Sequence, residues 1–172
     1  MDIRPASIKD EKEFTNLLAV REYVDDLVKY CFGMFDSFSK TVQEDEAKNE
    51  PLKFELREYQ FRKKLSQECS VHVRSNGFND YKTYDEFNMA LNSGHIQGCD
   101  SLDLHLDMSF RRGKEGALEE HNHKFTVKFN PDGSSFSYEA NYDDPTMNGI
   151  RDKLIAKLEA FPATTTIFSR AN

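Results

Sequence analysis

The sequence predicts an α+β fold, in which a mainly antiparallel sheet carries helices on one face and follows a helical N-terminal region. Apolar and polar residues alternate strictly over 101–110, as in a strand with one wet face. Apolar residues at spacings of three and four, typical of amphipathic helices, recur near 84–93 and 145–161. We therefore divide the chain into a helical region, 1–50, and an α+β domain, 51–172.

The helical prediction for the N-terminal region depends on a capping pattern and a long apolar stripe. Ser7 and Asp10 have the spacing of a capping box, although Glu or Gln is the usual second residue. The stripe that follows has nine members, which are Phe14, Leu17, Leu18, Val24, Leu27, Val28, Cys31, Phe35 and Phe38. Spacings of three and four place these side chains on one helical face.

The first part of the α+β domain is predicted as strand, then helix. Residues 52–67 fit a strand with a bulge between two alternating pairs, although their composition also suits a helix. Alternation over 69–74 indicates a strand. Thr83 and Glu86 form a capping box that opens a short helix, and Gly94 ends it.

A three-stranded meander and a helix complete the predicted domain. Its strands are expected around 102–110, 121–129 and 136–142, with a loop over 111–118. Asn130-Pro131-Asp132-Gly133 has the composition of a hairpin turn. Asp144 followed by Pro145 is typical of a helix start, and Pro162 is expected to end that helix.

Charge and composition exclude several classes of partner. The net charge of −7 disfavours binding to a phosphate backbone, so no nucleic-acid partner is expected. The three cysteines are scattered, without a CxxC pair, so we expect free thiols rather than a disulfide framework or a zinc site. The charged N-terminus is unlike a signal peptide, and no apolar run is long enough to span a bilayer. We expect a cytoplasmic protein that does not insert into membranes.

The polar face of the predicted sheet carries the first candidate site. Asp103, His105 and Asp107 project from one strand at intervals of roughly 7 Å. Together with His72, these side chains could bind a divalent metal or position a general base. The alternative is a solvated sheet face with cross-strand pairs between Asp and Lys, which we favour because catalytic groups usually lie at strand ends.

A second candidate is the pair His121 and His123, which share one strand face two residues apart. Such a pair suits zinc or nickel. The same face continues into Phe125 and Val127, so His123 also fits the edge of the core. No third ligand is identifiable, and neither phosphate-binding glycine motifs nor Gly-x-Ser-x-Gly is present. We therefore expect no cofactor.

Three segments, TYDEFNMAL, SLDLHLDMSF and GIRDKLIAKLEAF, resemble a domain found in uncharacterised bacterial proteins. The resemblance covers 69–161. In such proteins a helical segment often precedes the domain and membrane segments often follow it, which implies a sensing or interaction module. This sequence departs from that layout because no membrane segment follows Pro162. The chain is therefore either a soluble member or part of a longer protein.

These observations favour a non-enzymatic binding or protein-interaction module, with a metal-dependent hydrolase using Asp103, His105, Asp107 and His72 as the alternative. The predicted helices near 84–93 and 145–161 are sufficient to cover four strands. We therefore expect the N-terminal stripe to pack at a sheet edge or against a second copy of the chain. Self-association through this helix is the expected partner interaction, besides a protein partner of unknown identity.

Overall fold

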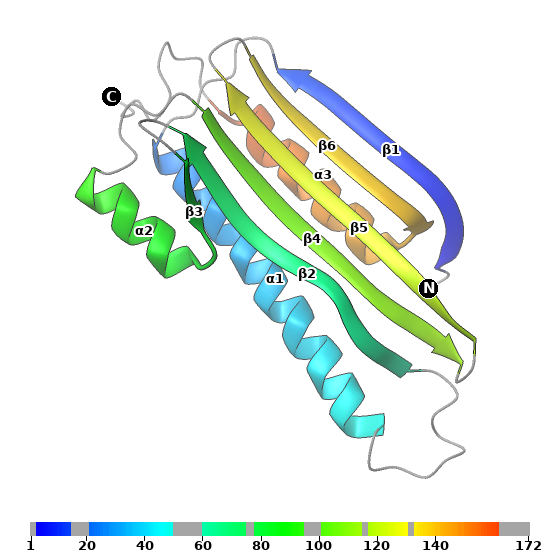
Figure 1. Cartoon of the computed structure of the whole chain (residues 1–172). Helices are drawn as coiled ribbons and strands as arrows, with labels where there is room; N and C mark the ends of the chain where they lie inside the picture. Colours follow the sequence, from blue (N-terminus) through cyan, green and yellow to red (C-terminus); the bar gives the residue numbers. More distant parts are fainter. Residues whose placement is uncertain are drawn as a thin grey trace.

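The computed structural model describes residues 3–14, 21–49, 60–74, 78–94, 101–114, 117–130 and 133–161. These residues form an antiparallel six-stranded sheet and three helices, which confirms the α+β class (Figure 1). The elements in chain order are β1 (Arg4–Phe14), α1 (Arg21–Asn49), β2 (Gln60–Arg74), β3 (Phe78–Tyr81), α2 (Tyr84–Ser93), β4 (Ser101–Lys114), β5 (Ala117–Asn130), β6 (Gly133–Asp143) and α3 (Pro145–Glu159). The strand order across the sheet is β1-β6-β5-β4-β2-β3.

The chain begins with a strand, so the prediction of a helix throughout the N-terminal region is wrong. Residues Arg4–Phe14 form β1 and pair with β6 at the edge of the sheet. Ser7 and Asp10 therefore lie within a strand and cap no helix, and Phe14 ends β1 instead of starting a helical stripe. The physical reason is that β6 offers its free main-chain groups to this segment. Helix α1 begins only at Arg21.

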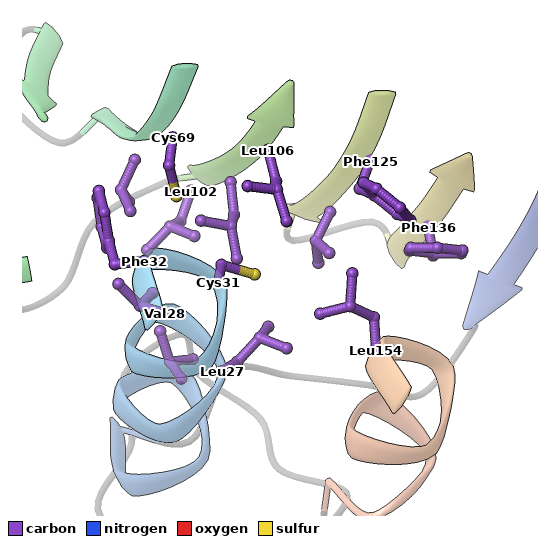
Figure 2. Close-up of a cluster of buried hydrophobic side chains, with 14 of the residues drawn as sticks. Leu27, Val28, Cys31, Phe32, Cys69, Leu102, Leu106, Phe125, Phe136 and Leu154 are labelled. Atoms are coloured by element: carbon purple, nitrogen blue, oxygen red, sulfur yellow. The ribbon is translucent and has the colours of Figure 1, made fainter. Parts of the chain in front are cut away.

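Helix α1 packs under the sheet, which corrects the expectation of an edge or intersubunit position. The stripe residues Val24, Leu27, Val28 and Cys31 are buried, and Phe35 and Phe38 pack partly buried against the same core. Figure 2 shows Leu27, Val28 and Cys31 directed at the sheet. Leu17 and Leu18 lie outside the described residues. The described stripe is thus covered within one chain, and the argument for self-association loses the exposed apolar face on which it rested.

Length explains why α1, rather than α2, shares the sheet with α3. Helix α1 has 29 residues and α2 has ten, which correspond to roughly 43 Å and 15 Å. Five of the strands have 11 to 15 residues. Only a long helix can follow such strands, and α1 contacts β2 and β4. Helix α2 contacts β3 and α1 instead (Figure 1).

In the second half of the chain, the helix caps and the hairpin turn lie where the local sequence signals predict them. Thr83 Oγ1 accepts the Glu86 amide N–H, and Gly94 ends α2 with a left-handed backbone, φ 79°. The Asp144 carboxylate accepts the Thr146 amide N–H at the start of α3, and Pro145 occupies its first turn. Gly133 pairs with Asn130 across the hairpin and has φ 147°. Pro162 lies outside the described residues.

The strands differ from their predicted bounds in two places. The loop predicted over 111–118 is mostly strand, since β4 continues to Lys114 and β5 begins at Ala117, and the two pair up to those residues. Main-chain hydrogen bonds between β4 and β5 continue through this segment, although its side chains no longer alternate between apolar and polar. The strand prediction for 52–67 is confirmed from Gln60 onward, with register shifts around Lys64; residues 52–59 lie outside the described residues.

The core lies between the sheet and the two long helices. The alternate residues of β4, Leu102, Leu104, Leu106, Met108 and Phe110, are all at most 2% exposed. Phe125, Phe136 and Leu154 from β5, β6 and α3 complete this layer (Figure 2). None of the helices within the described part of the chain is both long enough and apolar enough to cross a bilayer.

Candidate functional site

One face of the sheet carries no helix among the described elements. Figure 1 shows α1 and α3 on the same side of the sheet, with the other side open. The side chains directed to the open face from the central strands are polar, which are Asp103, His105, Asp107, Asn122, Lys124, Thr126, Lys128, Ser135, Ser137 and Glu139. Their apolar neighbours in sequence point into the core, because successive side chains alternate across a strand.

The open face is hollowed at two adjoining places. The larger hollow has a volume of about 580 Å³ and is lined by residues of β1, β4, β5 and β6, including Lys9, Asp107, Asn122, Lys124 and Glu139. The smaller hollow, about 270 Å³, lies over β2, β4 and β5. Asp107 and Lys124 line both hollows. The volume of the larger hollow lies within the range of small-molecule sites, roughly 300–1,000 Å³.

Opposite charges alternate across the larger hollow. Asp107 on β4 pairs in register with Lys124 on β5, Lys124 with Glu139 on β6, and Glu139 with Lys9 on β1. Neighbouring strands lie about 4.8 Å apart, so these four side chains form a row across the sheet. We call Asp107, Lys124, Glu139 and Lys9 the charge row. Lys9 Nζ lies 3.9 Å from Glu139 Oε1, and Ser109 Oγ donates to Asp107 Oδ1 at 2.8 Å.

The predicted triplet Asp103, His105 and Asp107 lies along β4 on the open face, and all three side chains are half-buried. Asp103 is in register with Lys128, as the cross-strand interpretation expected. Among the described residues, no group of three or more His, Cys, Asp or Glu side chains could hold a metal ion. The hydrolase built on this triplet stays a prediction.

The structure does bring His72 to His105. Their ring centroids lie 4.9 Å apart in an edge-to-face arrangement across β2 and β4. His72 Nδ1 and Asp80 Oδ1 on β3 are 2.5 Å apart, and Ser70 Oγ lies 3.1 Å from His72 Nε2. Since a carboxylate only accepts, His72 Nδ1–H donates to Asp80, and in the neutral imidazole the Ser70 hydroxyl donates to Nε2.

The chain Ser70–His72–Asp80 has the order of a nucleophile, a base and a group that orients the base. Its geometry does not make it a catalytic triad. Ser70 is fully buried, at 0% exposure, so a substrate carbonyl cannot approach its Oγ. The hydrogen bonds instead fix the imidazole of His72 at the border of the smaller hollow.

Sequence reasoning missed Ser70 and Asp80, as well as Lys9. Asn76-Gly77 between two strand-like segments is a hairpin signal, and it could have predicted the β2–β3 pairing that places Asp80 opposite His72. Lys9 was assigned to a helix. Its strand has charged side chains on both faces, so no apolar alternation could reveal β1.

His121 and His123 lie on the opposite, helix-covered face. His123 is 0% and His121 6% exposed, so both belong to the core layer and neither faces the hollows. His121 stacks between Tyr142 and Phe110, at centroid distances of 3.7 and 5.1 Å. The metal-binding alternative for this pair has no third ligand among the described residues.

Burial controls the ionisation of His123. Its Nδ1 shares a hydrogen bond of 2.9 Å with Tyr138 Oη, whereas Nε2 is buried without a hydrogen-bond partner. Burial lowers the pKa of His123 to about 4; the charge of Asp144 opposes this change and His121 adds to it. The neutral imidazole is therefore the form that the core accommodates.

Comparisons of the chain with protein-family models, with curated proteins and with solved structures give no match. The resemblance to bacterial sensing or interaction domains therefore stays a prediction.

Proposed function

We propose that the chain is a non-enzymatic binding module whose ligand lies on the open face of the sheet. The observation that carries this proposal is the placement of the helices, which cover the apolar face and leave a polar, hollowed face with two adjoining depressions. A rigid sheet supports the lining side chains, so the surface is formed before a ligand arrives. The absence of catalytic sequence motifs agrees with binding rather than turnover.

The open face suits a small polar ligand better than a protein. Protein interfaces usually have an apolar or aromatic core that supplies most of the binding energy. The outward side chains of β4, β5 and β6 are hydroxyl, amide, imidazole or charged groups. Such a surface provides hydrogen bonds and charge for a molecule that fits a hollow of about 580 Å³.

Amide chemical-shift mapping tests the proposal. The ¹⁵N-labelled chain is titrated with a panel of amino acids, sugars, dicarboxylates and nucleotides. We expect shifts that cluster around Lys124 and Glu139, and that disappear in Lys124→Met. Lys153→Met is the matched control, because Lys153 is an exposed lysine on α3. Shifts confined to the helices, or none with any compound, would contradict a binding role for this face.

The metal-dependent hydrolase has a separate test. Elemental analysis of protein purified without chelator measures bound metal, and Asp103→Ala removes one of the expected ligands. Stoichiometric metal that disappears in this variant would replace the binding module by the hydrolase.

A further inference from the structure

The alternating charges of the charge row indicate which class of ligand the larger hollow can bind. Two of its members are cations and two are anions, and they alternate from strand to strand. Lys124 lies between Asp107 and Glu139 in register, yet its ammonium group forms no ion pair with another described residue, whereas Lys9 contacts both Glu11 and Glu139. Lys124 is also exposed, so its ammonium group is accessible from the hollow.

The charges around the hollow disfavour ligands that carry charge of only one sign. A free anion meets Asp107 and Glu139 on either side of Lys124, and it is repelled by a chain of net charge −7. A free cation meets Lys124 between the same two carboxylates. A molecule that carries both signs can pair with each, and because it is neutral overall the net charge does not repel it.

We propose that the larger hollow binds a small zwitterion, in which an ammonium group and a carboxylate belong to the same molecule, as in an amino acid or a short unblocked peptide. The ligand carboxylate pairs with Lys124, and its ammonium group pairs with Asp107 or Glu139. This inference rests on the proposed function, since it assigns the ligand class of the same open face.

The strand spacing limits the length of the ligand. Lys124 and either neighbouring carboxylate are one strand apart, about 4.8 Å between main chains, and the whole row from Asp107 to Lys9 spans about 14 Å. An extended peptide covers roughly 3.5 Å per residue. Pairing across one strand spacing therefore favours a ligand of one or two residues, the whole row has room for at most four, and the ligand side chains are not needed for this recognition.

Glycine and its unblocked oligomers, from diglycine to tetraglycine, test the proposal without side-chain effects. Amide chemical shifts of the ¹⁵N-labelled chain report binding, with N-acetylated and C-amidated forms of each length as single-charge analogues. We expect at least one length to bind with shifts around Lys124, and each blocked analogue to bind at least tenfold more weakly. Lys124→Met should weaken binding at least tenfold.

Lys128→Met is the matched control. Lys128 lies four residues further along the same strand and is exposed, but it does not line either hollow. This variant should change the affinity less than twofold. Blocked and unblocked peptides that bind equally, or equal effects of the two lysine variants, would overturn the zwitterion assignment.

The panel of amino acids, sugars, dicarboxylates and nucleotides distinguishes a failure of the zwitterion assignment from a failure of the proposed binding function. If no glycine peptide and no amino acid binds but a sugar, a dicarboxylate or a nucleotide shifts amides around Lys124, the zwitterion assignment falls and the binding function survives. If no compound of either set affects the open face, both fall.

Discussion

Acid should destabilise this protein through one buried imidazole, that of His123. The side chain is 0% exposed, its Nε2 has no hydrogen-bond partner, and burial lowers its pKa from 6.5 to about 4. In the unfolded chain His123 recovers its ordinary pKa. Below pH 6.5 the unfolded state therefore binds a proton that the folded state does not, and the free energy of unfolding decreases.

The size of this effect follows from the two pKa values. They differ by roughly 2.5, and each pKa unit corresponds to about 1.36 kcal/mol. His123 should therefore lower the free energy of unfolding by about 3 kcal/mol between pH 7 and pH 4. At pH 4.5 the loss is about 2.5 kcal/mol, and below the folded pKa it stops growing because both states are protonated.

Urea unfolding at pH 7 and pH 4.5, followed by far-ultraviolet circular dichroism, measures this loss in the parent and in His123→Gln. Glutamine does not titrate, so the variant should lose about 2.5 kcal/mol less between the two pH values, even if it is less stable at pH 7. The titrating groups that do not interact with His123 contribute equally to both proteins and cancel. An identical loss in His123→Gln would refute the reasoning.

Four further outcomes test the fold. Leu154→Ala empties a fully buried site and should cost about 2–5 kcal/mol in chemical unfolding, whereas Lys153→Ala should stay within about 0.5 kcal/mol; equal costs would contradict the packing of α3. Thr83→Ala removes the cap of α2 and should cost about 1 kcal/mol by the same measurement, whereas no loss would mean that the cap is not needed. Val28→Asp should lower stability without changing the mass in sedimentation equilibrium; dissociation of a parent dimer would show that the stripe is intermolecular. Burial raises the pKa of Cys31 to about 12, so its thiol should resist iodoacetamide at pH 8 until urea unfolds the chain, and rapid labelling of Cys31 in the native protein, located by peptide mapping, would contradict its burial.

The sequence alone determined the elements whose signals are local. Strict alternation specified β4, because a period of two places every second side chain on the same face. Thr83, Gly94, Asp144 and Pro145 act on main-chain groups within a turn of their own position, so the bounds of α2 and the start of α3 were readable without the rest of the fold. The polar character of the open face followed from the same alternation.

Only the tertiary structure decided which elements share a layer. β1 has no apolar alternation, and it is a strand because β6 supplies its hydrogen-bond partners from more than 100 residues away. The apolar stripe of α1 has the same sequence pattern whether it covers its own sheet or a second chain. In the structure this long helix packs along the long strands of its own sheet, and its stripe is part of the core.

The candidate site shows the same division. Asp107 was assigned to the polar face from its own strand, but the charge row also needs Lys124, Glu139 and Lys9 from three other strands. The Ser70–His72–Asp80 chain needs the β2–β3 pairing. Periodicity assigns a side chain to one face of its own strand, whereas the neighbour across the sheet depends on strand order and register. Those two properties arise from the packing of the whole chain, and they placed His121 and His123 in the core and the charge row around a hollow.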